Sequence, residues 1–201
     1  MLTFERFYRE YPSPFIAGLA TIYARPAAIS KFLMGLCLLI VSITCMSGTA
    51  QAQDGQHEIT LVSLGDSLTA GYGLAPKDGF TPKLEAYLRA KGLAVRVING
   101  GVSGDTSSGG LARFDWVVPD AADAIIIELG ANDALRGINP DVTHANLTQI
   151  IEKSRARGLA ILLAGMLAPP NLGSAYGKRF AAIYPDLARK YDVALYPFFL
   201  D

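Results

Sequence analysis

Short runs of apolar, often β-branched residues alternate with longer amphipathic segments over most of this chain. Most of these runs are apolar on both faces, which is typical of parallel strands covered by helices on each side. Alternation of such strands with helices implies right-handed crossovers and a parallel sheet. We therefore predict an α/β domain with five strands. They are predicted at residues 59–64, 95–98, 124–129, 160–164 and 193–196.

Proline, asparagine and glycine mark the ends of two predicted helices. Pro82 is placed in the first turn of a helix that ends at Lys91-Gly92, between the first two strands. Asn139-Pro140 begins another helix, which ends at Arg157-Gly158. Proline in the first helical turn and glycine just after the last turn are the usual signals for these boundaries.

An uncharged apolar stretch at residues 32–46 precedes the predicted domain. It follows the basic residues Arg25 and Lys31 and is followed by an Ala-x-Ala sequence that ends at Ala52. This order predicts a secretory signal peptide over residues 1–52, cleaved after Ala52, whose long basic region leaves the true start of translation open. The alternative is an uncleaved anchor, but fifteen helical residues span only ~22 Å of a ~30 Å hydrocarbon core.

The composition of the whole chain narrows the class of protein that it can form. Lys+Arg and Asp+Glu both number 18, so no global basic field exists to bind nucleic acid. A hydrophobic content of 51% excludes an intrinsically disordered chain. Both cysteines, Cys37 and Cys45, lie in the predicted leader. The signal peptide predicts a periplasmic or secreted domain, and a domain without cysteines is expected to fold without a disulfide.

Unusual loops follow each of the first three predicted strands, at residues 65–72, 99–107 and 130–133. In an open parallel sheet, ligands bind outside the carboxyl ends of the strands. The second loop is rich in glycine, yet it matches neither common phosphate-binding motif and contains no lysine. A nucleotide site is therefore disfavoured.

These loops bring three chemical groups to neighbouring strand ends. Ser67 offers a hydroxyl at the start of a helix, although Asp66 and Ser67 could instead simply cap that helix. Gly104 allows a substrate oxygen to approach its backbone N–H, and Asn132 offers an uncharged amide donor or serves as a turn residue. A hydroxyl and two donors together are the parts of an acyl-transfer site.

At these residues the sequence resembles the SGNH (GDSL) hydrolases. The resemblance covers Gly65-Asp66-Ser67-Leu68, Gly104 and Gly130-Ala131-Asn132-Asp133, and it extends from about Ile59 to the end of the chain. It is closest to the bacterial group of acyl-CoA thioesterase I, lysophospholipase L1 and arylesterase. The stretches that carry this closer resemblance are residues 99–107, 109–114, 128–137 and 196–199.

The resemblance implies a flavodoxin-like three-layer α/β/α fold with strand order 2-1-3-4-5. The resemblance also implies that Ser67 is the nucleophile. It further implies that the oxyanion hole consists of the Ser67 N–H, the Gly104 N–H and the Asn132 side-chain amide. No metal or organic cofactor is required. Three aspartates are expected to be structural and to accept backbone N–H bonds: Asp66, Asp105 and Asp133.

The fourth block of the family, an Asp-x-x-His that supplies the general base, does not follow the last predicted strand. His57 is expected at the opposite edge of the sheet from Ser67, and His144 on the solvent face of a helix, so neither is assigned as the base. We expect a truncated form of a longer enzyme, without its last helix and inactive as it stands. The alternative is a genuine gene product of this length that has lost the general base.

The predicted reaction is hydrolysis of a small acyl ester or thioester through an acyl-Ser67 intermediate, by a monomer with no stable membrane span. One alternative is a carbohydrate or peptidoglycan O-acetylesterase, which would use the same residues. Another is a non-catalytic domain that binds acyl lipids or glycans. The loop at residues 166–177 is expected to line the acyl-binding groove, and its apolar and small residues favour a fatty or aryl acyl chain.

Overall fold

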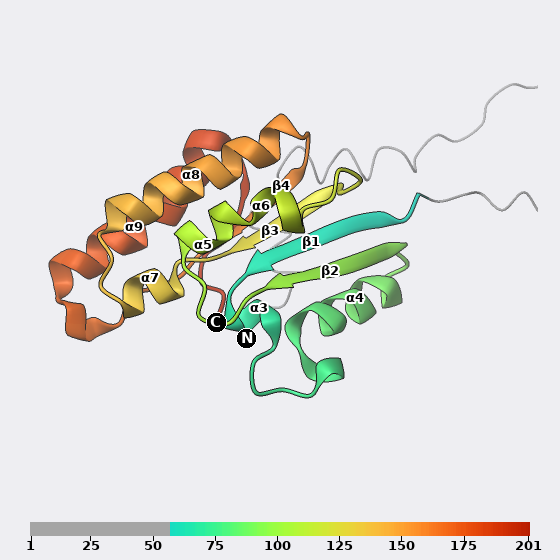
Figure 1. Ribbon diagram of the computed structural model, residues 1–201, viewed down its shortest axis with the longest axis horizontal. Helices are drawn as coiled ribbons and strands as arrows, with labels where there is room; N and C mark the ends of the chain where they lie inside the picture. Colours follow the sequence, from blue (N-terminus) through green and yellow to red (C-terminus); the bar gives the residue numbers. More distant parts are fainter. Residues whose placement is uncertain (1–56) are drawn as a thin grey trace, which may run out of the picture. The chain divides into compact units, whose positions relative to one another are not determined.

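The computed structural model describes residues 57–201. The predicted signal peptide, residues 1–52, lies outside the described residues. The described part forms a five-stranded parallel sheet in the order β2-β1-β3-β4-β5, which confirms the predicted fold class and strand order (Figure 1). The strands are β1 (Ile59–Gly65), β2 (Val95–Gly101), β3 (Ala124–Glu128), β4 (Ala160–Ala164) and β5 (Ala194–Tyr196).

Helices connect the strands and lie on both faces of the sheet. Figure 1 shows α4 on one face, next to β2, and α5, α6, α8 and α9 on the other. The four-residue α3 directly follows β1, and α7 follows β3. The helices are α3 (Ser67–Ala70), η1 (Pro76–Asp78), α4 (Phe80–Ala90), α5 (Ser107–Ala112), α6 (Phe114–Val117), α7 (Ala131–Leu135), α8 (Pro140–Ala156), η2 (Pro170–Leu172) and α9 (Ser174–Tyr191).

The two helices predicted from proline and glycine signals are confirmed. The Asn139 side chain accepts a hydrogen bond from the Asp141 N–H at 3.1 Å, and Pro140 begins α8. Pro82 is the third residue of α4. One expectation needs correction, because α9 begins at Ser174, inside the loop predicted at residues 166–177. The segment between β4 and α9 is therefore shorter than expected.

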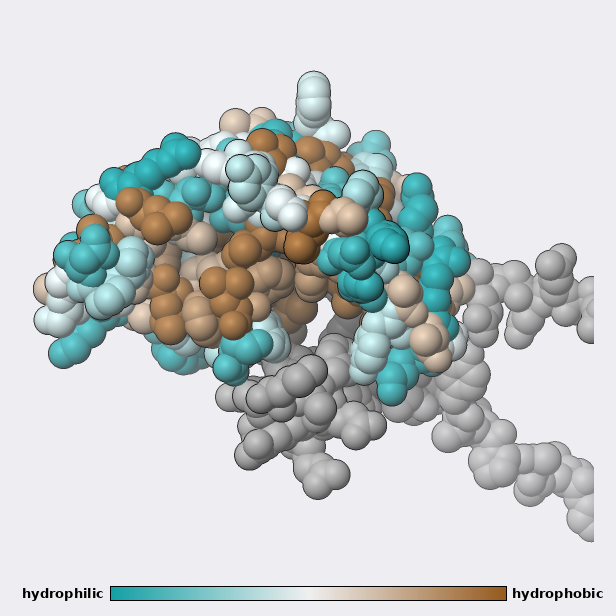
Figure 2. Space-filling model, turned by 90° about the horizontal axis from the view of Figure 1, so that it is seen from below, coloured by the Kyte–Doolittle hydropathy of each residue, from teal (hydrophilic) through white to brown (hydrophobic). Residues whose placement is uncertain are grey.

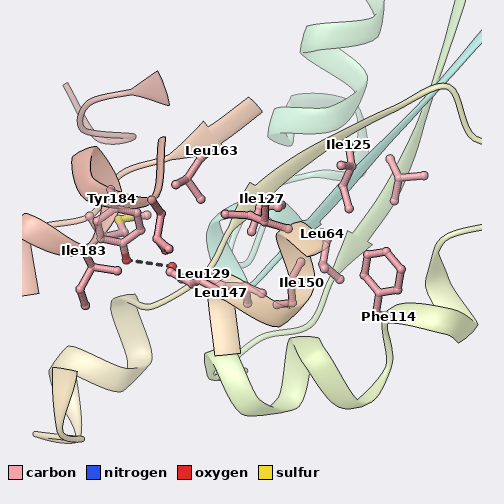
Figure 3. Close-up of a cluster of buried hydrophobic side chains, with 14 of the residues drawn as sticks. Leu64, Phe114, Ile125, Ile127, Leu129, Leu147, Ile150, Leu163, Ile183 and Tyr184 are labelled. Atoms are coloured by element: carbon pink, nitrogen blue, oxygen red, sulfur yellow. Dashed lines mark hydrogen bonds between the residues drawn. The ribbon is translucent and has the colours of Figure 1, made fainter. Parts of the chain in front are cut away.

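The main core lies between the sheet and the helices α5, α6, α8 and α9. Alternate strand residues such as Leu64, Ile125 and Ile127 point into it and are fully buried (Figure 3). The helices contribute Phe114, Leu147, Ile150, Phe180 and Tyr184. This core fixes the strands whose carboxyl ends carry the candidate site.

The opposite face of the sheet is less completely covered. There α4 packs on β2, whereas Leu162 of β4 and Ala194 of β5 are partly exposed. Figure 2 views the molecule from the side of α4 and shows apolar residues gathered at this surface. The strands are apolar on both faces, but the face that packs against α5, α6, α8 and α9 is more completely buried than the other.

Replacing Phe114 with alanine should test how much the main core contributes to stability. The Phe114 ring is fully buried, and the side chains of Lys153 and Arg157 lie over it. Loss of such a ring leaves a cavity, so the free energy of unfolding should fall by about 3–5 kcal/mol. Urea denaturation measures this change. The matched control is Trp116→Ala, because Trp116 is 90% exposed on the same helix. An equal loss in both variants would contradict this assignment.

Candidate active site

The carboxyl ends of β1 and its two neighbours, β2 and β3, are level with one another. Gly65, the last residue of β1, pairs with Gly101 of β2 and with Glu128 of β3. The chain segments that follow these strands therefore leave the sheet at the same edge. They carry Ser67, Gly104 and Asn132, respectively.

Ser67 is the first residue of α3, and its side chain is partly exposed. Asp66 caps this helix, with its Oδ1 atom accepting a hydrogen bond from the Leu68 N–H at 3.0 Å. The capping role considered from the sequence therefore belongs to Asp66. Ser67 remains at the surface of the strand end, where a hydroxyl can meet a ligand.

Asn132 lies beside the residue that precedes Ser67. Its Nδ2 atom donates a hydrogen bond to Asp66 Oδ2 at 2.9 Å. An amide nitrogen carries two hydrogens, so this bond leaves one N–H for another acceptor. Burial raises the pKa of Asp66 above its ordinary value, and hydrogen bonds from Leu68 and Asn132 oppose that rise.

A glycine is required just before α7, where Asn132 is the second residue. Gly130 has φ 117°, and a Cβ atom there would lie 2.2 Å from the Tyr184 hydroxyl. That hydroxyl donates to the Leu129 carbonyl at 2.9 Å and closes the end of β3 against α9. The placement of Asn132 therefore depends on a contact with a helix more than fifty residues away in the sequence.

Gly104 adopts a left-handed conformation, with φ 82°. Its carbonyl accepts a hydrogen bond from Arg136 Nη2 at 2.7 Å, and Arg136 is the C-cap of α7. The loop after β2 is thus attached to the helix that carries Asn132. Together with the Asn132–Asp66 bond, this contact links all three predicted loops.

Arg113 forms a further link that the sequence reasoning missed. Its guanidinium donates to the carbonyls of Gly65 at 2.8 Å and Gly100 at 2.7 Å, and to Asp105 Oδ2 at 2.7 Å. Asp105 is structural, as expected, but its expected partner needs correction, because its carboxylate binds this side chain and not a backbone N–H. The position of Arg113 within residues 109–114, one of the family-like stretches, was the available signal.

Asp133 has the structural role that was expected. Its buried carboxylate accepts the Ser107 N–H at 2.8 Å, together with the hydroxyls of Ser107 at 2.5 Å and Thr143 at 3.0 Å. These bonds join the start of α5 to α7 and α8. Asp66 likewise accepts a backbone N–H, from Leu68.

Neither histidine forms a hydrogen bond with the three loops in the described part of the chain. His57 lies at the amino edge of the sheet, as expected, and its Nε2 atom is 2.9 Å from Asp123 Oδ1. His144 is partly exposed on α8. Asp141, three residues before His144, binds Arg179 at 2.9 Å. The described residues therefore provide no assignable histidine base.

Within residues 57–201, no group of three or more histidine, cysteine or acidic side chains is arranged to hold a metal ion.

Comparison with known proteins identifies related chains and structures. Residues 63–201 match the GDSL-like Lipase/Acylhydrolase family. The chain is 39% identical to Esterase TesA of Pseudomonas aeruginosa over 170 residues, which cover 84% of this chain and 80% of that one. It is also 39% identical to Arylesterase of Vibrio mimicus over 165 residues, which cover 82% and 80% of the two chains.

A solved structure agrees with the sequence comparison. The crystal structure of AlinE4, described as an SGNH-hydrolase family esterase, is 48% identical and has a TM-score of 0.69. The match covers 72% of this chain and 78% of that one.

Proposed function

Because the chain belongs to the GDSL-like lipase/acylhydrolase family and is an ester-hydrolysing serine hydrolase, we propose that it acts through an acyl-Ser67 intermediate. The observation that carries this assignment is the 2.9 Å hydrogen bond between Asn132 and Asp66, the residue next to Ser67. It keeps an amide donor beside the hydroxyl at the carboxyl edge of the sheet.

In the proposed reaction, Ser67 Oγ attacks the carbonyl carbon of the substrate and gives its proton to a general base. The tetrahedral oxyanion accepts hydrogen bonds from the Ser67 N–H, the Gly104 N–H and the remaining Asn132 N–H. Collapse of this intermediate breaks the bond to the leaving alcohol or thiol, which takes up the proton. Water then attacks acyl-Ser67 by the same steps and releases the acid. No general base is assigned among the described residues.

Exposed apolar side chains favour an acyl chain as the group that is recognised. Large apolar residues are exposed on segments that follow the carboxyl ends of four strands. Exposed apolar side chains at this edge of the sheet can bury methylene groups of a substrate at about 0.8 kcal/mol each. These residues are Tyr72, Leu74, Val102, Leu135 and Leu167.

Substrate series assayed with the full-length protein test this function. We expect kcat/KM for p-nitrophenyl esters and acyl-CoA thioesters to rise with acyl length, as more methylene groups are buried. Acetylated xylan and O-acetylated peptidoglycan should be hydrolysed poorly. Hydrolysis confined to the acetylated glycans would establish the O-acetylesterase alternative. If the protein binds these compounds but hydrolyses none of them, it is a non-catalytic domain that binds acyl lipids or glycans.

The proposed location is the periplasm or the extracellular medium, on the basis of the signal peptide predicted at residues 1–52. No helix among residues 57–201 has the length and apolar character needed to cross a membrane.

A further inference from the structure

A fully buried acidic residue lies beneath the turn that carries Ser67. Glu128 ends β3, and its side chain is 0% exposed. Its Oε2 atom accepts hydrogen bonds from the Asp66 N–H at 3.2 Å and the Thr69 hydroxyl at 2.8 Å. The two donors lie on either side of Ser67 in the sequence. One carboxyl oxygen therefore holds both ends of the turn that presents the hydroxyl.

The turn closes tightly over this carboxyl group. A Cβ atom on Gly65 would lie 2.5 Å from Glu128 Oε2 and 2.1 Å from Thr69 Oγ1. Glycine is thus required at position 65 because Glu128 and Thr69 occupy the space that its side chain would need. The position of the strand end depends directly on where the Glu128 carboxyl group lies.

The surroundings of Glu128 disfavour a negative charge. Its Oε1 atom is buried and has no hydrogen-bond partner. If the carboxyl group were ionised, Oε1 would lose its hydration and gain no hydrogen bond in exchange. Burial, with the nearby charge of Asp66 as the second cause, raises the pKa of Glu128 to about 8.

The charged and titratable groups around this carboxyl do not include a neutralising cation among the described residues. Asp66 acts on it from the loop after β1, and Tyr184 of α9 interacts with it electrostatically. Arg113 binds the carbonyls of Gly65 and Gly100 and the carboxylate of Asp105, and not Glu128. The carboxyl group is consequently protonated at neutral pH.

We propose that Glu128 is a positioning residue for the nucleophile: its uncharged carboxyl group holds the Asp66 N–H and the Thr69 hydroxyl, and its ionisation loosens the turn that presents Ser67. This inference rests on the proposed role of Ser67. Once ionised, the buried Glu128 carboxylate lies next to the Asp66 carboxylate and needs hydration to be stable. Water reaches it only when the turn opens. A displaced nucleophile lowers kcat more than it changes KM, because the substrate still binds.

Variants of Glu128 in the full-length protein test this role through the dependence of kcat on pH. The wild-type kcat for a short acyl ester should fall above about pH 8. Glu128→Gln keeps an oxygen for both donors and cannot ionise, so it should retain the neutral-pH kcat and lack the alkaline decline. Glu128→Leu removes the acceptor and should lower kcat by about 100-fold at every pH, with KM little changed.

The matched control is Glu85→Gln. Glu85 Oε2 accepts the Val97 N–H at 2.8 Å and joins α4 to β2 away from Ser67. This variant should follow the wild-type pH profile. The inference is overturned if Glu128→Gln shows the wild-type alkaline decline, or if Glu128→Leu retains the wild-type kcat. If Glu128→Leu fails to fold, the dependence of kcat on pH in Glu128→Gln still tests the inference.

Stability gives a second readout that does not depend on catalysis. The folded protein keeps a proton on Glu128 that the unfolded chain releases near the ordinary glutamate pKa of 4.5. Its free energy of unfolding should therefore decline as the pH rises from 4.5 to about 8, and Glu128→Gln should lack this component. Identical slopes in both proteins would contradict the uncharged carboxyl. Absence of ester hydrolysis in the wild type would instead refute the proposed function.

Discussion

Replacing Ser67 with alanine should abolish ester hydrolysis and leave the fold intact. The expected fall in kcat is at least about 10⁴-fold, because removal of a nucleophile leaves only the contribution of binding and of the oxyanion donors. The Ser67 side chain is partly exposed, so the free energy of unfolding should change by no more than about 0.5 kcal/mol. Steady-state kinetics and urea denaturation measure the two quantities.

Ser174→Ala is the matched control for this substitution. Ser174 is exposed and is also the first residue of a helix, α9. The control should retain the wild-type kcat. Substantial hydrolysis by Ser67→Ala, at wild-type stability, would show that another group attacks the ester.

Removing the Asn132 amide should be the next most damaging change. Loss of one oxyanion donor lowers kcat by about 10²–10³-fold, and KM should change little because the donor binds the transition state more strongly than the substrate. Asn132→Ala also removes the hydrogen bond to Asp66. Asn132→Asp keeps the side-chain shape, but a carboxylate offers no donor, so it should be equally impaired.

Asn146→Ala controls for the loss of a partly exposed amide elsewhere. Asn146 Nδ2 donates to the hydroxyls of Ser107 at 2.9 Å and Ser108 at 2.8 Å, where α8 meets α5. Its kcat should be close to that of the wild type. A rise in KM alone in the Asn132 variants would mean that this amide binds the substrate and not the oxyanion.

The sheet could be predicted from the sequence because its signals are local. Apolar runs define the strands, and a parallel order brings the loops after them to one edge. Proline and glycine fixed the ends of α8 and the position of α4 for the same reason. Short helices such as α5, α6 and α7 have four to six residues, which is too few for a recognisable helical period.

The contacts that hold the site together could not be predicted in this way. Arg113 joins two strand ends and Asp105, and the bond from Asn132 to Asp66 spans 66 positions in the sequence. Such bonds depend on the packed positions of whole elements. Glu128 did carry a local signal, because it is a charged residue in a run of apolar strand residues. That signal does not predict which groups donate hydrogen bonds to its carboxyl group. Its partners, Asp66 and Thr69, follow from the register of β1 and β3.

The most direct measurement of the proposed chemistry is a crystal structure of the protein after reaction with an alkyl fluorophosphonate. The phosphorus should be bonded to Ser67 Oγ. One of its oxygens should accept hydrogen bonds of about 2.7–3.1 Å from the Gly104 N–H and from Asn132 Nδ2. An adduct on a different residue, or an oxygen that points away from both donors, would contradict acyl transfer at this strand edge.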